Sequence, residues 1–166
     1  MHWLWQMLKK APRTSPHRKK RLLAVASGGG HWIELLRLRP AFEEFQVSYV
    51  SMFDNYAASI PGSKYYTVPD GSRFNKGAAL TILLRSIYIM LRERPHAIIT
   101  TGSAPMLSFV LLGRLTRARV LWIDSLANSE HISTSGRVAK KLAHRTICQW
   151  ENVAEDEGLE CWGRVV

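Results

Sequence analysis

The feature that most constrains the fold is the stretch LLAVASGGGHWIELLRL, residues 22–38, in which an apolar run meets three consecutive glycines and a histidine. A short apolar run of this kind is typical of a β-strand that is buried on both faces of a sheet. The residues after the glycines carry apolar side chains at helical spacing, and these are Ile33, Leu35, Leu36, Leu38 and Phe42. The stretch therefore predicts a strand, a tight glycine turn and a helix that begins near His31.

The same alternation of strand and helix continues along the chain. Further strands are predicted at FQVSYVSM, KYYTVP, HAIITTG, RVLWIDS and RTICQW, and further helices at residues 77–94, 105–116 and 136–144. Strands that alternate with helices form a parallel sheet with right-handed crossovers, and 166 residues are enough for one such core. The prediction is a Rossmann-like α/β domain over residues 21–166, preceded by a basic, tryptophan-containing appendage over residues 1–20.

Three loops are expected at the carboxyl edge of this sheet, where open α/β sheets bind their ligands. They cover residues 27–31, 101–105 and 124–130. In the first loop, glycines let a ligand approach the backbone, and the free N–H groups of the following helix attract a phosphate. The dinucleotide pattern G-x-G-x-x-G fails because Ile33 stands at its last position, and the ending of a P-loop is absent. The residues predicted to bind phosphate here are Ser27, Gly28, Gly29 and Gly30.

His31, at the start of the predicted helix, is the first candidate catalytic residue. Its imidazole can donate to a pyrophosphate or act as a base on an acceptor hydroxyl, and the alternative is a histidine that caps the helix. Gly102 and Ser103 stand at a second helix start, where Ser103 either caps the helix or binds a phosphate oxygen. Asp124 and Ser125 follow a predicted strand. Asp124 is a candidate to orient His31 or a sugar hydroxyl, or else a structural acid, and Ser125 is a candidate phosphate ligand.

The formal net charge of +10 is unevenly distributed, because seven Lys and Arg residues precede the first acid. Trp3 and Trp5 stand just ahead of this basic run, and indole rings favour the headgroup zone of a membrane. An anionic partner, either a membrane surface or nucleic acid, is expected here, the alternative being an unstructured tail. No segment approaches the roughly 20 apolar residues that span a bilayer, so membrane binding is expected to be peripheral. Cys148 and Cys161 form no metal-ligand pattern, and no metal site is predicted.

The helix predicted at residues 77–94 carries two apolar stripes. One stripe follows helical spacing and is predicted to pack into the core, and it consists of Leu80, Leu83, Leu84, Ile87 and Leu91. The other stripe is half apolar and half basic, and it consists of Ile82, Arg85, Ile89 and Arg92. A face of this composition is predicted to lie on a membrane, with a subunit interface or a second buried layer as the alternatives.

Several motifs, taken in their order along the chain, resemble one family of proteins. They are SGGGHWIELLRL, TTGSAP, WIDS, STSGRVAKKLAHRTICQW and CWGRVV. The resemblance is to the acceptor-side, membrane-anchoring subunits of split GT-B glycosyltransferases. Members of this family act on dolichol-linked glycans or in bacterial capsule and exopolysaccharide assembly. The resemblance covers residues 21–166.

The resemblance implies that this chain binds a lipid-linked sugar acceptor while a separate donor-binding chain supplies a UDP-sugar. The implied reaction adds the sugar to a polyprenyl-pyrophosphate-linked glycan in capsule or exopolysaccharide synthesis, by direct displacement with inversion and without a metal or other cofactor. The implied location is peripheral, on the cytoplasmic face of a membrane. In the family, the glycine loop, here Gly28 to His31, faces the acceptor's pyrophosphate, and Asp124 and Ser125 stand where relatives carry Glu-Ser.

Three other classes of function remain open. A recruitment subunit that does no chemistry would tolerate substitution of both His31 and Asp124. A nucleotide-dependent oxidoreductase or methyltransferase is disfavoured by Ile33 in the glycine pattern. Nucleic-acid binding ranks last and is not predicted, because the basic charge lies in a tail and no nucleic-acid-binding module is recognised.

Overall fold

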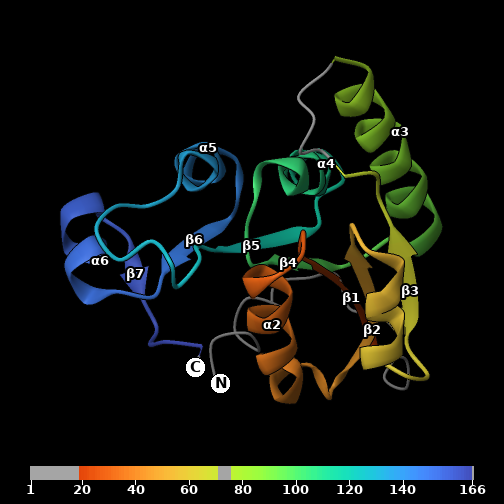
Figure 1. The fold of residues 1–166 in the computed structure, drawn as a ribbon, viewed down its shortest axis with the longest axis horizontal. Helices are drawn as coiled ribbons and strands as arrows, with labels where there is room; N and C mark the ends of the chain where they lie inside the picture. Colours follow the sequence, from red (N-terminus) through yellow and green to blue (C-terminus); the bar gives the residue numbers. More distant parts are fainter. Residues whose placement is uncertain (1–18, 71–75, 166) are drawn as a thin grey trace.

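One parallel sheet organises the chain in the structure, a computed structural model that describes residues 19–70 and 76–165. Within these residues the strand order is β3-β2-β1-β4-β5-β6-β7, and every neighbouring pair is parallel (Figure 1). The strands are β1 (Lys20–Val25), β2 (Phe45–Ser51), β3 (Lys64–Thr67), β4 (Ala97–Thr100), β5 (Arg119–Ile123), β6 (Arg145–Cys148) and β7 (Glu160–Cys161). All six strands predicted from the sequence are present, and the Rossmann-like α/β fold class is confirmed.

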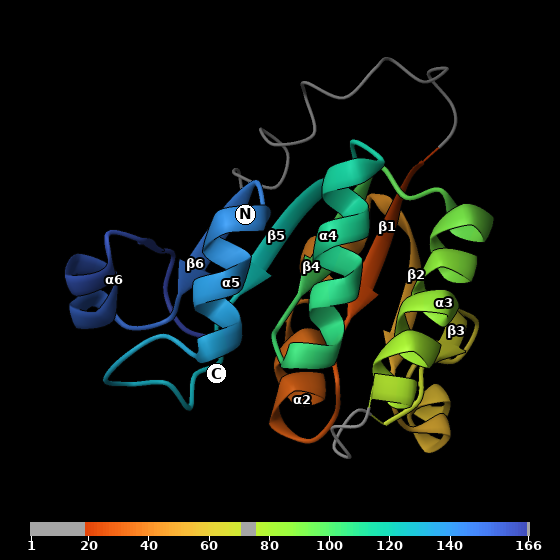
Figure 2. The ribbon, with the colours of Figure 1, turned by 90° about the horizontal axis from the view of Figure 1, so that it is seen from above.

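The helices cover both faces of this sheet. They are α2 (Gly30–Arg37), α3 (Lys76–Glu93), α4 (Leu107–Leu115), α5 (Thr134–Leu142) and α6 (Glu151–Glu157), with 3₁₀ turns η1 (Arg39–Phe42), η2 (Asp54–Ser59) and η3 (Ala104–Met106). Helices α3, α4 and α5 lie side by side on one face, and α2 lies on the other (Figures 1 and 2). The short elements α6 and β7, which the sequence patterns do not predict, extend the sheet beyond β6.

Alternate residues of β1 explain why its sequence is a continuous apolar run. Leu22 and Ala24 belong to the core cluster on the α2 side, whereas Leu23 and Val25 belong to the cluster on the side of α3 and α4. A strand with helices over both faces has no side that can carry polar residues. The central strands therefore place a rigid, fully buried base beneath the loops at their carboxyl ends.

Helix α3 is turned by about half its circumference from the predicted orientation. Ile82 and Ile89, which we predicted to face a membrane, are buried, with Ile89 0% exposed. The predicted core stripe faces outward instead, with Leu80, Leu84 and Leu91 exposed and with Leu83 and Ile87 half-buried. The assignment of Ile82 and Ile89 as membrane-facing residues is therefore wrong, and the exposed apolar side of α3 is the leucine side.

Polar residues on the buried side of α3 explain the error. Ser86 is fully buried, and its hydroxyl contacts both the Ile82 carbonyl (2.8 Å) and the Ser108 hydroxyl (2.8 Å) on α4. Glu93 is also buried, so the core-facing stripe contains a hydroxyl and a carboxyl group. A search for apolar periodicity assigns such residues to solvent unless their buried partners are known.

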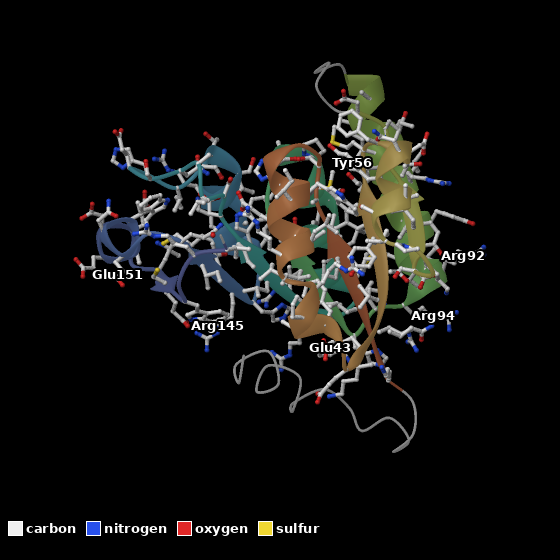
Figure 3. All side chains as sticks on the ribbon, turned by 60° about the horizontal axis from the view of Figure 1, so that its bottom comes forward. Glu43, Tyr56, Arg92, Arg94, Arg145 and Glu151 are labelled. Carbon is white, nitrogen blue, oxygen red and sulfur yellow. The ribbon has the colours of Figure 1, made fainter. Side chains whose placement is uncertain are left out.

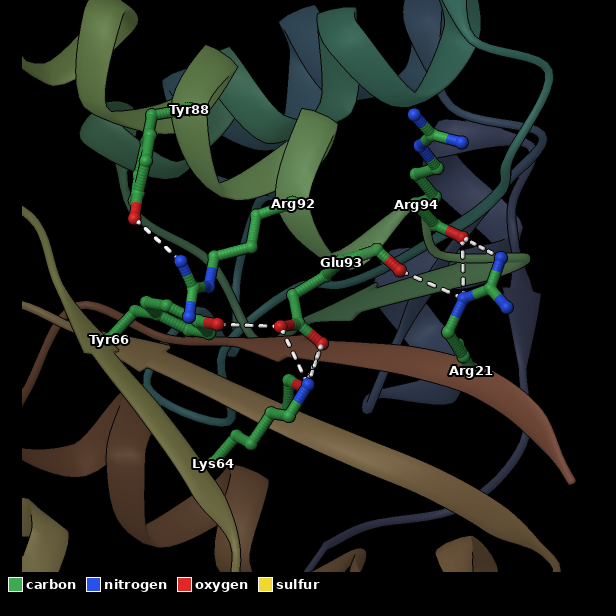
Figure 4. A network of polar contacts seen from close by, with 8 residues as sticks. Arg21, Lys64, Tyr66, Tyr88, Arg92, Glu93 and Arg94 are labelled. Atoms are coloured by element: carbon green, nitrogen blue, oxygen red, sulfur yellow. Dashed lines mark hydrogen bonds and ion pairs between the residues drawn. The ribbon is translucent and has the colours of Figure 1, made fainter.

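The Glu93 carboxylate ties the end of α3 to the edge of the sheet (Figure 4). It accepts hydrogen bonds from the Ser48 hydroxyl (2.7 Å), the Tyr66 hydroxyl (2.5 Å) and Lys64 Nζ (3.0 Å). Burial opposes ionisation of Glu93, but the hydrogen bonds from Tyr66, Ser48 and Lys64 outweigh it and lower the pKa of this carboxyl. Glu93 therefore remains charged and fixes the orientation of α3 on the sheet.

Candidate functional site

The candidate site lies where the direction of the sheet reverses. The chain runs outward from β1 to β2 and β3 on one side, and from β4 to β5 and β6 on the other, so β1 and β4 are central neighbours. Ligands of open α/β sheets bind outside the carboxyl ends of the strands at such a switch point. The glycine loop follows β1, and the loop at residues 101–103 follows β4. Both loops were predicted to carry site residues, and the topology brings them together.

His31 joins the two loops. Its Nδ1 lies 2.8 Å from the Thr101 carbonyl oxygen, and the Thr101 hydroxyl donates to the His31 carbonyl oxygen at 2.6 Å. His31 is half-buried, whereas Thr101 is 0% exposed. The imidazole is therefore held against the carboxyl end of β4, between the glycine loop and the loop at residues 101–103.

Gly102 makes room for this imidazole. It has φ +120°, and an added Cβ would lie 3.1 Å from Cε1 and 3.2 Å from Nδ1 of His31. Any L-residue at this position would be both strained and in conflict with the ring. The phosphate-binding role predicted for Gly102 stays a prediction, and what the structure shows is that Gly102 admits the ring of His31.

Ser103 is an unusual residue in two respects. Its φ is +83°, which is a strained conformation for a residue with a side chain. Its hydroxyl oxygen is buried and, within the described residues, has no hydrogen-bond partner, and it does not cap the following turn η3. The capping alternative is therefore excluded. The other alternative, in which Ser103 binds a phosphate oxygen, stays a prediction.

The glycine loop combines a packed half and an open half. An added Cβ at Gly28 would lie 2.3 Å from the ring of Phe53, so Gly28 is needed for packing against that ring. The Gly29 N–H donates to the hydroxyl of Tyr56 on η2 at 3.0 Å; Tyr56 is labelled in Figure 3. Tyr56 also stacks on Trp32 of α2, with ring centroids 5.1 Å apart. Beside Gly29 and Gly30, by contrast, an added Cβ would meet nothing within 4 Å.

The open half of the loop coincides with the start of α2. Gly29 has φ +56° and directs the chain into the helix, whose first-turn N–H groups have no acceptor within the helix. These amides and the helix dipole favour an anionic ligand. The buried Ser27 anchors the loop from below, because its carbonyl accepts from the Met52 N–H (3.1 Å) and from the Ser51 hydroxyl (2.5 Å).

Asp124 has the structural role that was the alternative to catalysis. It is 2% exposed, and its carboxylate accepts four hydrogen bonds. Oδ1 accepts from Trp122 Nε1 (3.2 Å) and the Ser133 hydroxyl (2.6 Å), and Oδ2 accepts from Asn128 Nδ2 (2.9 Å) and the Ser133 N–H (2.9 Å). A carboxylate has about four acceptor sites, so none remains for a substrate or for His31. The assignment of Asp124 as a catalytic residue is corrected accordingly.

Ser125 is likewise engaged in the interior, with a partner that the sequence patterns miss. Its hydroxyl donates to Oε1 of Glu34 at 2.8 Å, and the other carboxylate oxygen of Glu34 accepts from Gln149 Nε2 at 3.0 Å. Glu34 is buried, while its neighbour Ile33, one of the apolar residues at helical spacing in the predicted helix, is 53% exposed. The predicted phosphate contact of Ser125 is therefore not available without breaking this bond. Because Ser125 and Glu34 are 91 positions apart, no local sequence pattern indicates that they form a hydrogen bond.

The remaining predicted residues concern the membrane. Trp3 and Trp5 lie outside the described residues. Arg85 and Arg92 are exposed on α3, where Arg85 Nε donates to the Thr67 carbonyl (3.1 Å). Among the helices described, none is both long and apolar enough to cross a bilayer. In the same part of the chain, no three His, Cys, Asp or Glu side chains are grouped as metal ligands.

Comparisons with known proteins agree with the fold and add a family. The family model described as "Oligosaccharide biosynthesis protein Alg14 like" matches residues 67–165, which is more than half of the chain. The Schizosaccharomyces pombe protein named "UDP-N-acetylglucosamine transferase subunit alg14" is 26% identical over 175 residues, covering 87% of this chain and 82% of that protein. A Candida albicans protein of the same name is 26% identical over 171 residues, covering 84% of this chain and 78% of that protein.

Solved structures show the same fold at low sequence identity. MurG of Acinetobacter baumannii has a TM-score of 0.67 at 16% identity, covering 81% of this chain and 42% of that one. UDP-N-acetylglucosamine 2-epimerase of Rickettsia bellii has a TM-score of 0.68 at 12% identity, covering 86% of this chain and 43% of that one. The chain thus shares its fold with a part of each of these enzymes and spans less than half of each structure. The family match over residues 67–165 establishes that the chain belongs to the Alg14-like family of oligosaccharide biosynthesis proteins.

Proposed function

We propose that this chain is the acceptor-binding subunit of a two-chain glycosyltransferase, with residues 21–166 forming the acceptor domain. A separate donor-binding subunit holds a UDP-sugar, and this chain binds a polyprenyl-pyrophosphate-linked glycan whose hydroxyl receives the sugar. The observation that carries the proposal lies at the β1–β4 switch point, where Thr101 holds His31 directly after the open backbone of Gly29 and Gly30. The names of the fungal relatives make UDP-N-acetylglucosamine the first donor to test.

The start of α2 and the imidazole of His31 suit two different parts of the acceptor. The first-turn amides of α2 and the unpaired hydroxyl of Ser103 suit the pyrophosphate, since both offer hydrogen bonds to an anion. His31 then accepts the proton of the acceptor hydroxyl. The hydroxyl oxygen bonds to the anomeric carbon, and the bond from that carbon to the UDP oxygen breaks, with the electron pair and negative charge leaving on UDP. The imidazolium then releases its proton to solvent, which returns His31 to its neutral form.

The outward side of the helix layer suits a membrane surface. Five exposed leucines form the α3–α4 face: Leu80, Leu84 and Leu91 on α3, and Leu111 and Leu115 on α4. Exposed basic residues are also found on α3, α4 and α5, and these are Arg85, Arg92, Arg114, Arg137, Lys140 and Lys141. Among the described residues of these three helices the one acid is Glu93, and it is buried. Figure 3 shows Arg92 beside α3 at one end of the molecule and Glu151 at the opposite end.

This composition favours an anionic lipid surface over a protein partner or bulk water. A leucine gains about 1.5–3 kcal/mol on full burial, and each cation adds about 1 kcal/mol near an anionic leaflet. The predicted membrane contact thus moves from Ile82 and Ile89 to the leucine side of the same helix, and Arg85 and Arg92 remain part of it. The proposed location is peripheral, on a cytoplasmic membrane face, and the proposed process is the assembly of a capsule or exopolysaccharide glycan.

Membrane binding is tested with vesicles. The chain should cosediment with vesicles containing anionic phospholipid and dissociate at high salt, because charge attraction is screened. Replacing Leu84 and Leu91 by Glu should abolish cosedimentation. Replacing Ile33 by Glu is the matched control, since Ile33 is equally exposed but lies on α2, on the other face of the sheet. Equal binding of both variants would rule out the α3–α4 face as the docking surface.

The chemistry is tested with the reconstituted pair. The tagged chain is captured from solubilised membranes with its donor-binding subunit, and sugar transfer from UDP-N-acetylglucosamine to a polyprenyl-pyrophosphate acceptor is measured. His31→Ala should lower kcat by roughly 10²- to 10⁴-fold, as expected for a general base. His131→Ala is the control, because His131 is exposed and belongs to neither the glycine loop nor the loop at residues 101–103. If the complex that contains His31→Ala keeps full activity, His31 is not the base. The second candidate function, a recruitment subunit that does no chemistry, would then remain.

A further inference from the structure

We infer that Thr101 is a positioning residue, which fixes the tautomer of His31 and thereby makes Nε2 the nitrogen that accepts the acceptor's proton. The inference rests on the proposed function and deepens it, because the sequence leaves open whether His31 acts as a base or as a phosphate ligand. It is carried by two hydrogen bonds between His31 and Thr101, residues that are 70 positions apart.

The first hydrogen bond determines the tautomer. Nδ1 of His31 lies 2.8 Å from the carbonyl oxygen of Thr101. A carbonyl oxygen can only accept, so Nδ1 must carry the proton and donate it. In a neutral imidazole the other nitrogen, Nε2, then has a free lone pair. A histidine side chain in water favours the proton on Nε2, so the contact with Thr101 selects the less common tautomer at this position.

The second hydrogen bond keeps the first in place. The Thr101 hydroxyl donates to the His31 carbonyl oxygen at 2.6 Å, so one residue contacts both the backbone and the ring of His31. Thr101 is 0% exposed, and its own N–H donates to the Val25 carbonyl of β1. Gly102, whose added Cβ would lie 3.1 Å from the ring, leaves the space that the imidazole occupies. The start of α2 is therefore fixed relative to β4, and the ring has little freedom to rotate.

This arrangement distinguishes the two roles of His31. A neutral imidazole with its proton on Nδ1 cannot donate from Nε2 to a phosphate oxygen, but it can accept a proton from a hydroxyl there. Once Nε2 is protonated, the bond from Nδ1 to the Thr101 carbonyl becomes charge-assisted and roughly twice as strong. The Thr101 carbonyl therefore stabilises the imidazolium that forms when the acceptor hydroxyl is deprotonated. The arrangement therefore suits a base, and while the imidazole is neutral it leaves Nε2 with no proton to donate to a phosphate oxygen.

The tautomer is measured first, on the intact chain without substrate. Nitrogen-15 NMR of the imidazole rings, with His31→Gln to assign the His31 signals, reports which nitrogen is protonated near neutral pH. We expect the proton on Nδ1 and a free lone pair on Nε2. A spectrum with the proton on Nε2 would overturn the inference, even if the pair transfers sugar.

The role of Thr101 is measured next, with two variants of the paired enzyme. Thr101→Val removes the hydroxyl at nearly constant volume, and Thr101→Ser retains it. We expect Thr101→Val to mix the two tautomers and to lower kcat on the order of 10²-fold, as misplacement of a reacting group does, with KM for the acceptor nearly unchanged. Thr101→Ser should restore both. A Thr101→Val variant that keeps the wild-type tautomer and kcat would refute a positioning role.

The outcomes separate this inference from the proposed function. If His31→Ala is inactive but the tautomer is the opposite one, the proposed function stands and the inference fails. If the tautomer is as expected but His31→Ala is fully active, the geometry is right and the proposed chemistry is wrong. The wild-type spectrum decides the first point even if Thr101→Val fails to fold.

Discussion

Replacing Asp124 by Asn separates a structural carboxylate from a catalytic one. The carboxylate accepts four hydrogen bonds, two on each oxygen, and thereby holds the loop at residues 124–133 and the start of α5. Asn keeps one oxygen but places an NH₂ group where the Asn128 amide and the Ser133 N–H now donate. The Asn128 amide can flip to compensate, but the Ser133 N–H cannot, and it loses its acceptor.

The expected cost follows from these contacts. One buried donor left without a partner costs about 1–3 kcal/mol, and the bonds that remain lose the charge assistance worth up to about 1.5 kcal/mol. We therefore expect Asp124→Asn to lower the free energy of unfolding by about 3 kcal/mol. For a chain of this size, that corresponds to a Tm lower by about 6–12 °C. Denaturant unfolding followed by circular dichroism, together with a thermal scan, measures both quantities.

The control is Asp156→Asn, at an exposed position on α6, which should stay within about 0.5 kcal/mol of wild type. Assayed with its partner well below the lowered Tm, the Asp124→Asn variant should retain sugar transfer within a few fold. An Asp124→Asn variant that is as stable as the control would refute the reasoning. So would one that folds normally at the assay temperature but loses activity as severely as His31→Ala.

Three further results are expected. Ile89→Ala should destabilise the chain by about 2–5 kcal/mol, whereas Leu91→Ala, on the exposed side of the same helix, should change its stability by less than about 0.5 kcal/mol, both measured by urea unfolding. His144 Nδ1 accepts a hydrogen bond from the Val120 N–H, and burial, assisted by nearby arginines, lowers the pKa of His144 from 6.5. The stability that the neutral ring contributes is therefore present above pH 6.5 and is lost as the pH falls below that value. In His144→Asn, whose side-chain oxygen can take over the hydrogen bond, the stability should vary less between pH 7.5 and 5, and an unchanged slope would exclude His144 as its source. Gly102→Ala should shift the His31 ring signals in NMR and lower the Tm, because its φ is +120° and its Cβ would meet the ring.

The fold was predictable from the sequence because the relevant signals are local. Each central strand is a short apolar run, and each crossover helix shows periodicity, so the alternation predicts a parallel sheet without any knowledge of long-range contacts. The same reasoning places the glycine loop and the loop at Gly102 at one edge. The elements α6 and β7 escaped prediction because one is a short, acidic helix and the other a two-residue strand.

The details of the site were less predictable, because they depend on buried polar pairs. Glu34 and Glu93 are acids on buried helix sides, and each is stabilised by residues far away in the sequence. If Glu93 is assumed to be solvent-exposed, the inferred orientation of α3 is reversed. If Glu34 is assumed to be solvent-exposed, the neighbouring Ile33 is wrongly expected on the buried side of α2. The contact between Thr101 and His31 could not be predicted for the same reason, because no residue near Thr101 in the sequence indicates it. A pattern of apolar residues locates strands and helices, but not the polar partners that decide which side of a helix is inside.

The thickness of the helix layer also sets how far a lipid-linked substrate has to reach. With the α3–α4 face on a bilayer, the carboxyl edge of the sheet lies about one helix diameter, roughly 10 Å, above the leucines. The headgroup zone itself extends about 5–7 Å above the hydrocarbon on each side. A pyrophosphate at the level of the headgroups, followed by one or two sugars, covers that height while the polyprenyl chain stays among the acyl chains. The subunit would therefore work on short glycans near the surface without extracting the lipid.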